Sequence, residues 1–327
     1  MPRVGRPGPR PAADEGDPPG WTLRAVAPAK LNLGLAVVGK RPDGYHDLLT
    51  IFQTIDLEDD LFFRETVGPG ISLRVEAEEP IPGGADNLVL RAAELLAGAR
   101  GVAQGAEILL RKRIPAGAGL GGGSSDAAAA LLGLEALWGL APDPEERRRL
   151  AIELGSDVPF FLVGGTARGE GRGEILTPLP GPPEMAWLLF VPDFRVSTAD
   201  AFRSLPPTLT ASRQELRMLE DAIIHGDSEA FARHVVNDLE PGVVRMEPRL
   251  ARIRDVLRRR GARAVGLTGS GSAMFALFGS QGDLAPILDA GTGLSGGWAR
   301  SCRPMDSRAA VVTRNHDDHR DPDCSPG

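Results

Sequence analysis

The sequence predicts a mixed α/β protein, of the α+β kind, made of two domains. Segments with a strand pattern and segments with a helix pattern are interspersed along the whole chain. The chain has 327 residues, 42% of them hydrophobic and 25% charged, which is enough for two cores. Residues 178–183 include four prolines, a composition typical of a connection between domains.

The part of the chain before this connection is predicted to be rich in strands. A pair of strands spans residues 21–35 and is interrupted by Pro28. Residues 39–46 have the turn chemistry of a loop. Further strands are expected at 48–55, 60–64, 71–76, 106–112 and 160–163. Helical patterns begin at Asn87, at about Ser125 and at Asp143, and run to about 96, 140 and 155.

Beyond the connection, strands and helices follow each other in the order of a split β-α-β domain. Strands are expected at 185–191, 263–267, 273–278 and 298–302. Helices are expected at about 198–205, 213–225, 228–239, 248–261 and 283–288. We therefore place the two domains at residues 22–180 and 181–303. Residues 1–21 and 304–327 are polar or proline-rich, and we expect a disordered extension and a disordered tail.

Composition excludes several classes of protein. The formal net charge of −7 argues against a general nucleic-acid binder. No apolar run reaches the ~18–20 residues that span a bilayer, and no signal-peptide pattern is present, so no membrane association is expected. The two cysteines, Cys302 and Cys324, make neither a disulfide framework nor a metal site, which favours a cytoplasmic location. The pair His316 and His319 has metal-like spacing, but it lies in the polar tail and is expected to be inert.

The most informative stretch is a glycine-rich loop at residues 115–123, which is followed by a buried helix. Five of the seven residues 117–123 are glycine, so backbone N–H groups can approach a ligand closely. Ser124 or Ser125 can cap the helix that follows. The N-terminus of a helix also attracts anions. The stretch therefore predicts a phosphate site rather than a flexible linker.

The residues that flank the loop exclude one known type of phosphate-binding loop and argue against another. No Gly-Lys-Ser/Thr follows the glycines, so the loop is not a Walker A motif. Gly117, Gly119 and Gly122 match the dinucleotide fingerprint, but a second helix follows where that fingerprint needs a strand ending in an acidic residue. A nicotinamide oxidoreductase thus stays as an alternative that a titration with NADH would test.

Three motifs in order resemble those of the GHMP kinases, a family of small-molecule kinases. The loop PAGAGLGGGSS at 115–125 is similar to the second motif of the family. PAKLNLGL at 28–35 resembles the first motif and GLTGSGSA at 266–273 the third. The resemblance covers roughly residues 22–303. It implies an N-terminal domain like domain 2 of ribosomal protein S5, a ferredoxin-like C-terminal domain and a site between them.

Further segments narrow the resemblance within the family. They are AKLNL, RPDGYH (41–46), GSDVPF (155–160), VSTA (196–199) and NDLE (237–240). They are similar to members that transfer phosphate from ATP to the 2-hydroxyl of a cytidine diphosphate derivative of methylerythritol. That step belongs to the non-mevalonate route to isoprenoid precursors. The resemblance implies ATP and Mg²⁺ as cofactors.

Lys30 and Asp157 are the candidate catalytic residues. Strand alternation places Lys30 and Asn32 on one face and leucines on the other. A buried lysine needs an anionic partner, and an ion pair with Asp157 would keep that carboxylate ionised. Asp157 is then the group that orients the acceptor hydroxyl and takes its proton. A helix-capping role for Asp157 and a solvent-exposed Lys30 are the structural alternatives.

The acceptor is expected to be recognised by aromatic residues. Tyr45, the only tyrosine, adjoins His46 in a loop, and such rings suit a nucleobase. The resemblance implies that this pair binds cytosine, that Phe202 covers its other face, and that Asn32 and Gly269 lie near the substrate. A core ring with a surface hydroxyl is the alternative for Tyr45.

The remaining candidates concern ATP. The expected cofactor-binding residues are Pro115, Ala116, Gly117, Ala118, Gly119, Leu120, Gly121, Gly122, Gly123, Ser124, Ser125, Asn87, Lys112 and Asp126. Asn87 and Lys112 match family positions near the base and ribose, although a helix cap and a solvated strand end explain them equally well. Asp126 would face Mg²⁺ or the adenine amino group, and Ser124 or Ser125 would touch the metal, touch a phosphate or cap the helix.

We expect a kinase that binds a small-molecule cytidine diphosphate, and neither nucleic acid nor membrane, as a monomer or a weak homodimer. Two alternatives lie within the same fold. One is a GHMP kinase for homoserine or mevalonate, against which Tyr45 and His46 argue because those substrates have no nucleobase. The other is a non-catalytic regulator that binds a ligand, against which the presence of both Lys30 and Asp157 argues.

Overall fold

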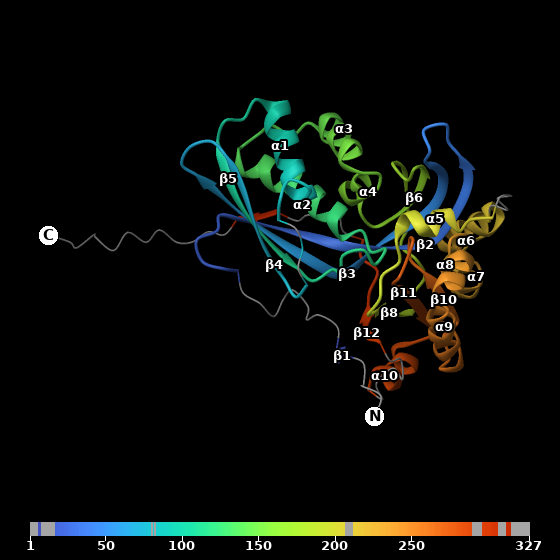
Figure 1. Cartoon of the computed structure of the whole chain (residues 1–327). Helices are drawn as coiled ribbons and strands as arrows, with labels where there is room; N and C mark the ends of the chain where they lie inside the picture. Colours follow the sequence, from blue (N-terminus) through green and yellow to red (C-terminus); the bar gives the residue numbers. More distant parts are fainter. Residues whose placement is uncertain are drawn as a thin grey trace.

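The computed structural model of the chain describes residues 6–7, 17–79, 81, 83–206, 212–289, 296–306 and 312–314. These residues form two β-sheets with helices packed against each (Figure 1). The arrangement is mixed α/β, which confirms the fold class predicted from the sequence. No helix in this part of the chain is long and apolar enough to cross a membrane.

The first sheet has two very long central strands. Its members are β2 (Leu23–Lys40), β3 (His46–Thr66), β4 (Ile71–Ala77), β5 (Gly105–Lys112), β6 (Thr166–Gly171), β7 (Ile175–Leu179), β9 (Val236–Asn237) and β13 (Val312–Arg314). The order is β13-β2-β3-β5-β4, while β6 pairs with β3 and β9 with β2. β4 and β5 run parallel and are joined by a helix, which makes a β-α-β unit.

Helices α1 (Leu88–Arg100), α2 (Gly122–Leu137), α3 (Pro144–Leu154) and α4 (Val158–Val163) form one group beside this sheet. Helix α2 lies against α1 and strands β2 and β3, and every side chain from Ala127 to Leu131 is fully buried. A helix buried on nearly all sides is what its continuous apolar sequence predicts. Its N-terminus is thereby fixed at the glycine-rich loop.

The second sheet is antiparallel apart from a short edge strand. Its order is β1 (Arg6–Pro7), β12 (Gly297–Cys302), β8 (Ala186–Pro192), β11 (Met274–Phe278) and β10 (Ala264–Leu267). The helices of this part are α5 (Thr198–Arg203), α6 (Arg213–His225), α7 (Ser228–Arg233), α8 (Glu240–Met246), α9 (Arg249–Arg259) and α10 (Gln281–Asp289). β11 lies between β8 and β10, which confirms the split β-α-β order.

Several predicted strand boundaries are wrong because pairing continues across local irregularities. Pro28 does not interrupt a strand: β2 runs through it, with a shift of register between Pro28 and Ala29 where the neighbouring strand absorbs the irregularity. The two strands expected at 48–55 and 60–64 are one strand, β3. A long partner strand stabilises both segments, an effect that local pattern does not contain.

One further strand prediction and one helix prediction also need correction. Residues 160–163 form part of α4 rather than a strand, because a short apolar run fits either state and Pro159 sits in the first turn of a helix. The helix expected at 228–239 ends at Arg233, and Val236–Asn237 instead pairs with the edge of β2. Helix α8 begins only at Glu240.

The ends of the chain contain two short strands where disorder was expected. β1 pairs with β12, and β13 pairs with β2. The expectation is corrected at these five residues, because free edges of both sheets offer backbone partners there. Most of the predicted extension and tail, including the pair His316 and His319 and also Cys324, lies outside the described residues.

A shared apolar cluster joins the two sheets. It combines Leu31 and Leu33 of β2 with Trp187 of β8 and Phe275 of β11, all fully buried. The outer face of the first sheet is thus covered by the second part of the molecule. This packing brings the loop 266–273, between β10 and β11, against the glycine-rich loop.

Candidate active site

The glycine-rich loop connects β5 to α2 and is held open by positive φ angles. Gly117, Gly119 and Gly121 have φ of 67°, 82° and 72°, a region that favours glycine. The carbonyl of Leu120 accepts a hydrogen bond from the backbone N–H of Lys30 at 2.9 Å. The loop is thus fixed to the strand that carries the candidate lysine.

Helix α2 begins earlier than the sequence pattern predicts. Its N-cap is Gly121, which makes no side-chain cap, and Ser124 and Ser125 lie inside the first turn. The expected serine cap is therefore wrong: a glycine in the left-handed region starts the helix directly from the loop. The first N–H groups of α2 have no acceptor within the helix, so the N-terminus still suits an anion.

The loop 266–273 forms a second wall beside the first. The N–H of Ala273 donates to the carbonyl of Ala118 at 3.1 Å. The hydroxyl of Thr268 donates to the carbonyl of Gly119 at 3.3 Å. A Cβ placed on Gly119 would lie 2.2 Å from the carbonyl oxygen of Thr268. Only glycine allows two backbones to approach this closely.

Gly269 lies within this second wall. The side-chain amide of Asn237 donates to the carbonyls of Leu267 and Gly269, each at 2.8 Å. A Cβ on Gly269 would come within 3.4 Å of the Oδ1 atom of Asn32. The first and third motifs therefore meet here, as expected for a common site.

Lys30 and Asp157 form the predicted ion pair, with 3.6 Å between Nζ and Oδ2. Lys30 is 4% exposed, whereas the Asp157 side chain is 30% exposed and reachable from solvent. Burial lowers the pKa of Lys30, and the charge of Asp157 opposes that shift. The Asp157 carboxylate makes no capping bond although it stands at the start of α4, so the capping alternative is wrong.

Asn32 is tied into the same buried face. Its Oδ1 accepts from Nζ of Lys30 at 2.5 Å, and its Nδ2 donates to the hydroxyl of Thr50 at 2.8 Å. Its backbone N–H donates to the hydroxyl of Thr268 at 3.0 Å. The shared face of Lys30 and Asn32 agrees with the strand alternation.

Lys112 and Asp126 lie together on the far side of the loop. Nζ of Lys112 donates to Asp126 at 2.7 Å and also pairs with Asp59, and all three side chains are at most 5% exposed. Burial lowers the pKa of Lys112, but the charges of Asp126 and Asp59 outweigh it and raise that pKa overall. Burial raises the pKa of Asp126 well above its usual range, and Lys112 only partly offsets this.

Two more of the expected ATP residues are Asn87, at the start of α1, and Ser125, within α2. Asn87 caps α1, its side chain accepting from the N–H of Val89 at 2.9 Å. The hydroxyl of Ser125 and the Oδ1 atom of Asp126 are buried without a hydrogen-bond partner. Within the residues that the structure describes, no three His, Cys, Asp or Glu side chains form a group that could hold a metal ion.

The aromatic candidates come together at the other end of the site. The His46 ring stacks on Phe202 with centroids 5.1 Å apart and planes 21° apart. The Tyr45 ring is 57% exposed, and the guanidinium of Arg172 lies 4.5 Å from its centroid. Tyr45 is thus no core ring, which excludes the structural alternative. Burial, helped by the charge of Lys40, lowers the pKa of His46.

Sequence reasoning missed four residues that shape the site: Thr50, Asp59, Arg172 and Thr268. Thr268 lies inside the third motif, where a hydroxyl between Leu267 and Gly269 is the signal that could have indicated it. Asp59 stands within an acidic run, Glu58-Asp59-Asp60, which joins the two strands predicted at 48–55 and 60–64. Consecutive carboxylates between two apolar predicted strands could have indicated buried ion pairs.

Models of known families match both parts of the chain. The GHMP kinases N terminal domain matches residues 87–165, and the GHMP kinases C terminal model matches residues 219–292. Curated relatives from Pelotomaculum thermopropionicum and Solibacter usitatus are 47% and 44% identical over 78% of this chain. The match covers 88% and 80% of their own lengths, and both are named 4-diphosphocytidyl-2-C-methyl-D-erythritol kinase.

The chain belongs to the 4-diphosphocytidyl-2-C-methyl-D-erythritol kinase family. This confirms the resemblance predicted from the three motifs. A crystal structure of 4-(cytidine 5'-diphospho)-2C-methyl-D-erythritol kinase is 38% identical, with a TM-score of 0.70, and covers 85% of this chain and 98% of that one. Homoserine kinase from Cytophaga hutchinsonii shares the fold, with a TM-score of 0.74 at 20% identity over 91% of this chain and 99% of that one. As a member of this kinase family, the chain is an ATP-dependent small-molecule kinase.

Proposed function

We propose that this kinase transfers the γ-phosphoryl group of ATP to the 2-hydroxyl of 4-diphosphocytidyl-2-C-methyl-D-erythritol. The products are the 2-phosphate and ADP, in the non-mevalonate route to isoprenoid precursors. One observation carries the proposal. Beside the glycine-rich loop, Nζ of the buried Lys30 lies 3.6 Å from Oδ2 of Asp157, a carboxylate that makes no helix-capping hydrogen bond. Family membership and the names of the curated relatives support the substrate.

The loop from Pro115 to Gly123 and the N-terminus of α2 hold the phosphates of ATP. Positive φ angles at three glycines keep side chains out of the cradle. Unpaired N–H groups and the helix dipole stabilise the negative charge there. In phosphoryl transfer such positioning and charge stabilisation supply most of the rate enhancement.

Mg²⁺ is the cation that ATP brings to kinase sites, where it keeps several waters and few protein ligands. The few oxygen ligands that the protein offers near the loop fit this kind of coordination. The Ser125 hydroxyl and one oxygen of Asp126 are buried oxygens without partners, and Ser124 lies in the same turn. When bound, the ion neutralises phosphate charge during transfer.

Asp157 orients the acceptor hydroxyl and takes its proton. Its carboxylate is accessible from solvent, and the Nζ atom of Lys30 lies 3.6 Å from it. Lys30 and Asn32 share a hydrogen bond and so hold the polar face of β2 toward the substrate. Asn87, Lys112 and Asp126 then lie on the side of the loop assigned to the ATP base and ribose.

Tyr45, His46 and Phe202 bind the cytosine of the acceptor, with Gly269 near its phosphates. The rings of His46 and Phe202 come from separate elements and meet at 5.1 Å, so residues far apart in sequence close one aromatic site. Cytosine presents both a π-face for stacking and hydrogen-bonding edges for a neutral imidazole.

We further propose that the enzyme works in the cytoplasm as a monomer or a weak homodimer, with residues 22–180 and 181–303 as its two domains. The small number of cysteines and the acidic net charge support this setting. Sedimentation velocity across a range of protein concentrations would measure the state of association.

Replacement of Asp157 by Asn tests the catalytic assignment. We expect kcat to fall by about 10²-fold or more, the scale of a lost general base. ATP affinity should stay the same because the phosphate loop is untouched. An unchanged kcat in this variant would show that Asp157 is not the base.

The acceptor is tested by an ADP-release assay with four candidates. These are 4-diphosphocytidyl-2-C-methyl-D-erythritol, mevalonate, homoserine and a sugar. We expect turnover with the cytidine diphosphate alone, because the other three have no base for the aromatic site. Preferential turnover of homoserine or mevalonate would overturn the proposed substrate.

A further inference from the structure

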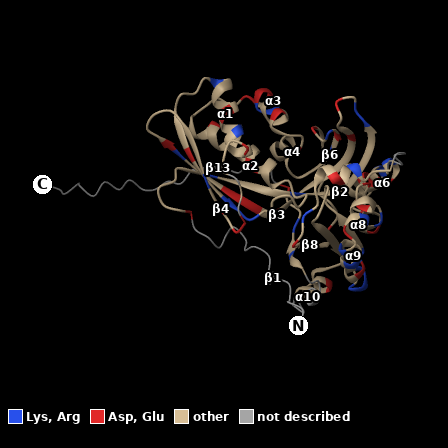
Figure 2. Cartoon of the chain, viewed as in Figure 1, with Lys and Arg blue, Asp and Glu red and all other residues tan. Residues whose placement is uncertain are grey.

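Asp59 is a buried carboxylate beside the glycine-rich loop that the proposed chemistry does not use. We propose that Asp59 is a positioning residue for ATP, which holds the phosphate loop at both its entry and its exit. The inference rests on the proposed function, since it takes residues 115–123 as the phosphate loop. Figure 2 shows acidic and basic segments next to each other on the strands near β3 and β4, where this network lies.

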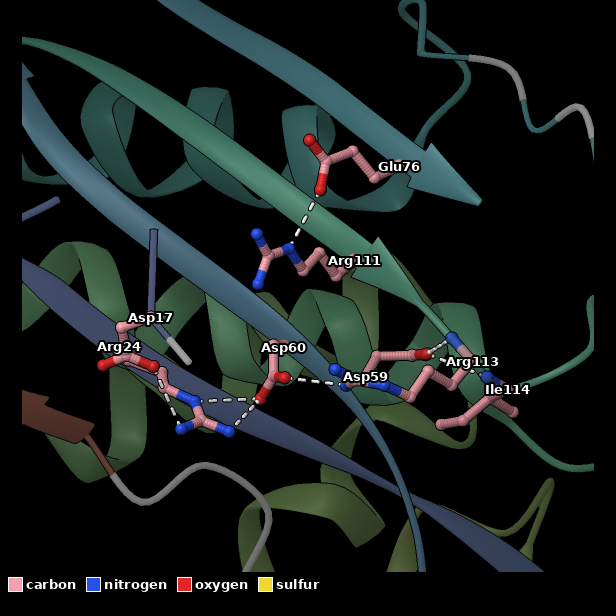
Figure 3. A network of polar contacts seen from close by, with 8 residues as sticks. All are labelled: Asp17, Arg24, Asp59, Asp60, Glu76, Arg111, Arg113 and Ile114. Atoms are coloured by element: carbon pink, nitrogen blue, oxygen red, sulfur yellow. Dashed lines mark hydrogen bonds and ion pairs between the residues drawn. The ribbon is translucent and has the colours of Figure 1, made fainter. Parts of the chain in front are cut away.

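At the entry, Asp59 binds the backbone that leads into the loop. Its Oδ1 atom accepts from the N–H of Arg113 at 2.5 Å and from the N–H of Ile114 at 2.8 Å (Figure 3). Pro115 follows and has no N–H. Asp59 therefore fixes the last two residues before the loop through one carboxylate oxygen.

At the exit, Asp59 acts through Lys112. Its Oδ2 atom pairs with Nζ of Lys112, and the same Nζ binds Asp126 at 2.7 Å. Asp126 is the fifth residue of α2, three residues after the last residue of the loop. A continuous series of buried contacts thus runs from residue 114 to residue 126 around the outside of the loop.

Asp60, on the opposite side of β3, also holds the segment that leads into the loop. Its carboxylate binds Arg24 at 2.8 Å and the Arg113 guanidinium at 2.7 Å (Figure 3). Asp59 is 0% exposed and Asp60 is 1% exposed. In such surroundings an ion pair is costly to break, because the remaining charge is left without water.

A loop with five glycines in seven residues has many accessible conformations. Ordering it around phosphates costs conformational entropy unless its ends are already held. Preorganisation of this kind increases affinity for a ligand without adding a contact to it. Asp59 supplies it from outside the site, which is why it is a positioning residue and not a catalytic one.

The test compares Asp59→Asn and Asp59→Ala with Glu135→Gln. Asn keeps an acceptor for the two N–H groups but loses the charge that holds Lys112, whereas Ala loses both. Glu135 is a matched control: it is buried on the same helix, α2, and pairs with Arg147 at 2.9 Å, but it does not contact the loop. The dissociation constant of ATP, both KM values, kcat and Tm are measured for each protein.

We expect Asp59→Asn to raise the dissociation constant and KM for ATP about tenfold, the scale of one lost charged hydrogen bond. The KM for the acceptor and kcat should change less than about twofold, the usual range for an untouched contact. Asp59→Ala should bind ATP more weakly still. Glu135→Gln should lower Tm and leave ATP affinity unchanged.

Two results would overturn the inference: wild-type ATP affinity in folded Asp59→Asn, or an equal loss of ATP affinity in Glu135→Gln. If Asp59→Ala fails to fold, the Asn variant still decides the outcome because it keeps the backbone acceptor. A wild-type protein that binds no ATP would instead refute the proposed function, so the two failures are distinguishable.

Discussion

At the scale of single residues, the site depends on a lysine that burial disfavours. Lys30 is 4% exposed, and desolvation lowers its pKa although Asp157 opposes the shift. A buried ion pair of this kind contributes little to stability, since removing two charges from water costs as much as their attraction returns. In the proposed reaction its value lies in orienting the Asp157 carboxylate.

Replacing Lys30 by Met should therefore separate activity from stability. We expect kcat to fall at least tenfold, the scale of about one lost electrostatic contact, while the free energy of unfolding at pH 7 stays the same or rises. The unfolded lysine titrates near 10.5, above the lowered folded pKa, so wild-type stability rises with pH between the two values. Urea unfolding at several pH values checks this prediction. Between the folded and the unfolded pKa of Lys30, any excess of the variant's free energy of unfolding over that of the wild type should shrink as the pH rises. A variant much less stable at pH 7 would contradict it.

The exposed ring of Tyr45 leads to a second prediction at this scale. Tyr45→Ala should raise the KM for the cytidine acceptor about tenfold, the scale of a lost stack between a base and a ring. The KM for ATP should not change, because the phosphate loop lies elsewhere. Tyr45→Phe keeps the ring and serves as control. Steady-state kinetics with each substrate varied in turn would detect the opposite result, a loss of ATP affinity.

At the scale of elements, the proposed phosphate site is a junction between a loop and a helix. Helix α2 begins at Gly122 because Gly121 adopts a left-handed conformation, with φ of 72°, that starts the helix without a capping side chain. Its buried apolar body fixes the direction of its N-terminus. The motif predicted such a junction, while the serine cap was wrong because the glycine conformation made it unnecessary.

Gly119→Ala tests this junction. The added Cβ would meet the Thr268 carbonyl at 2.2 Å, and φ of 82° is strained for alanine. We expect a loss of about 1–3 kcal/mol in the free energy of unfolding and weaker ATP binding. Gly98→Ala in α1 is the control: no atom lies within 4 Å of its Cβ position, and a helix gains about 0.5–1 kcal/mol from this change. Equal free energies of unfolding in the two variants would contradict the close approach of the backbone at Gly119 to the Thr268 carbonyl.

At the scale of the whole molecule, the site exists where the two sheets meet. The Thr268 hydroxyl accepts from the N–H of Asn32, 236 residues earlier in the chain, and donates to the carbonyl of Gly119. One side chain thus connects the first, second and third motifs. Figure 1 shows the long strands β2 and β3 extending from the group of α1 to α4 toward the helices of the C-terminal half.

Thr268→Val removes only the hydroxyl from this connection. The buried N–H of Asn32 and the partly buried carbonyl of Gly119 would lose this partner, at a cost of about 1–3 kcal/mol for the buried N–H. We expect a lower free energy of unfolding and weaker ATP binding. Thr177→Val, at an exposed position of β7, is the control and should stay within about 0.5 kcal/mol of wild type. Urea unfolding and ATP titration would measure both quantities. Equal free energies of unfolding and equal ATP affinities in the two variants would contradict the role of the Thr268 hydroxyl.

The sequence by itself determined the α/β class, the glycine-rich loop and its helix, the polar face of Lys30 and Asn32, and the family. These follow from local periodicity, glycine content and short motifs, which the backbone expresses within a few residues. Only the tertiary structure decided the length of β2 and β3, the helix at α4, the Asp59–Lys112–Asp126 network and the meeting of His46 with Phe202. Each of these depends on burial and pairing between segments far apart in the chain, where the partner and not the local pattern sets the energy.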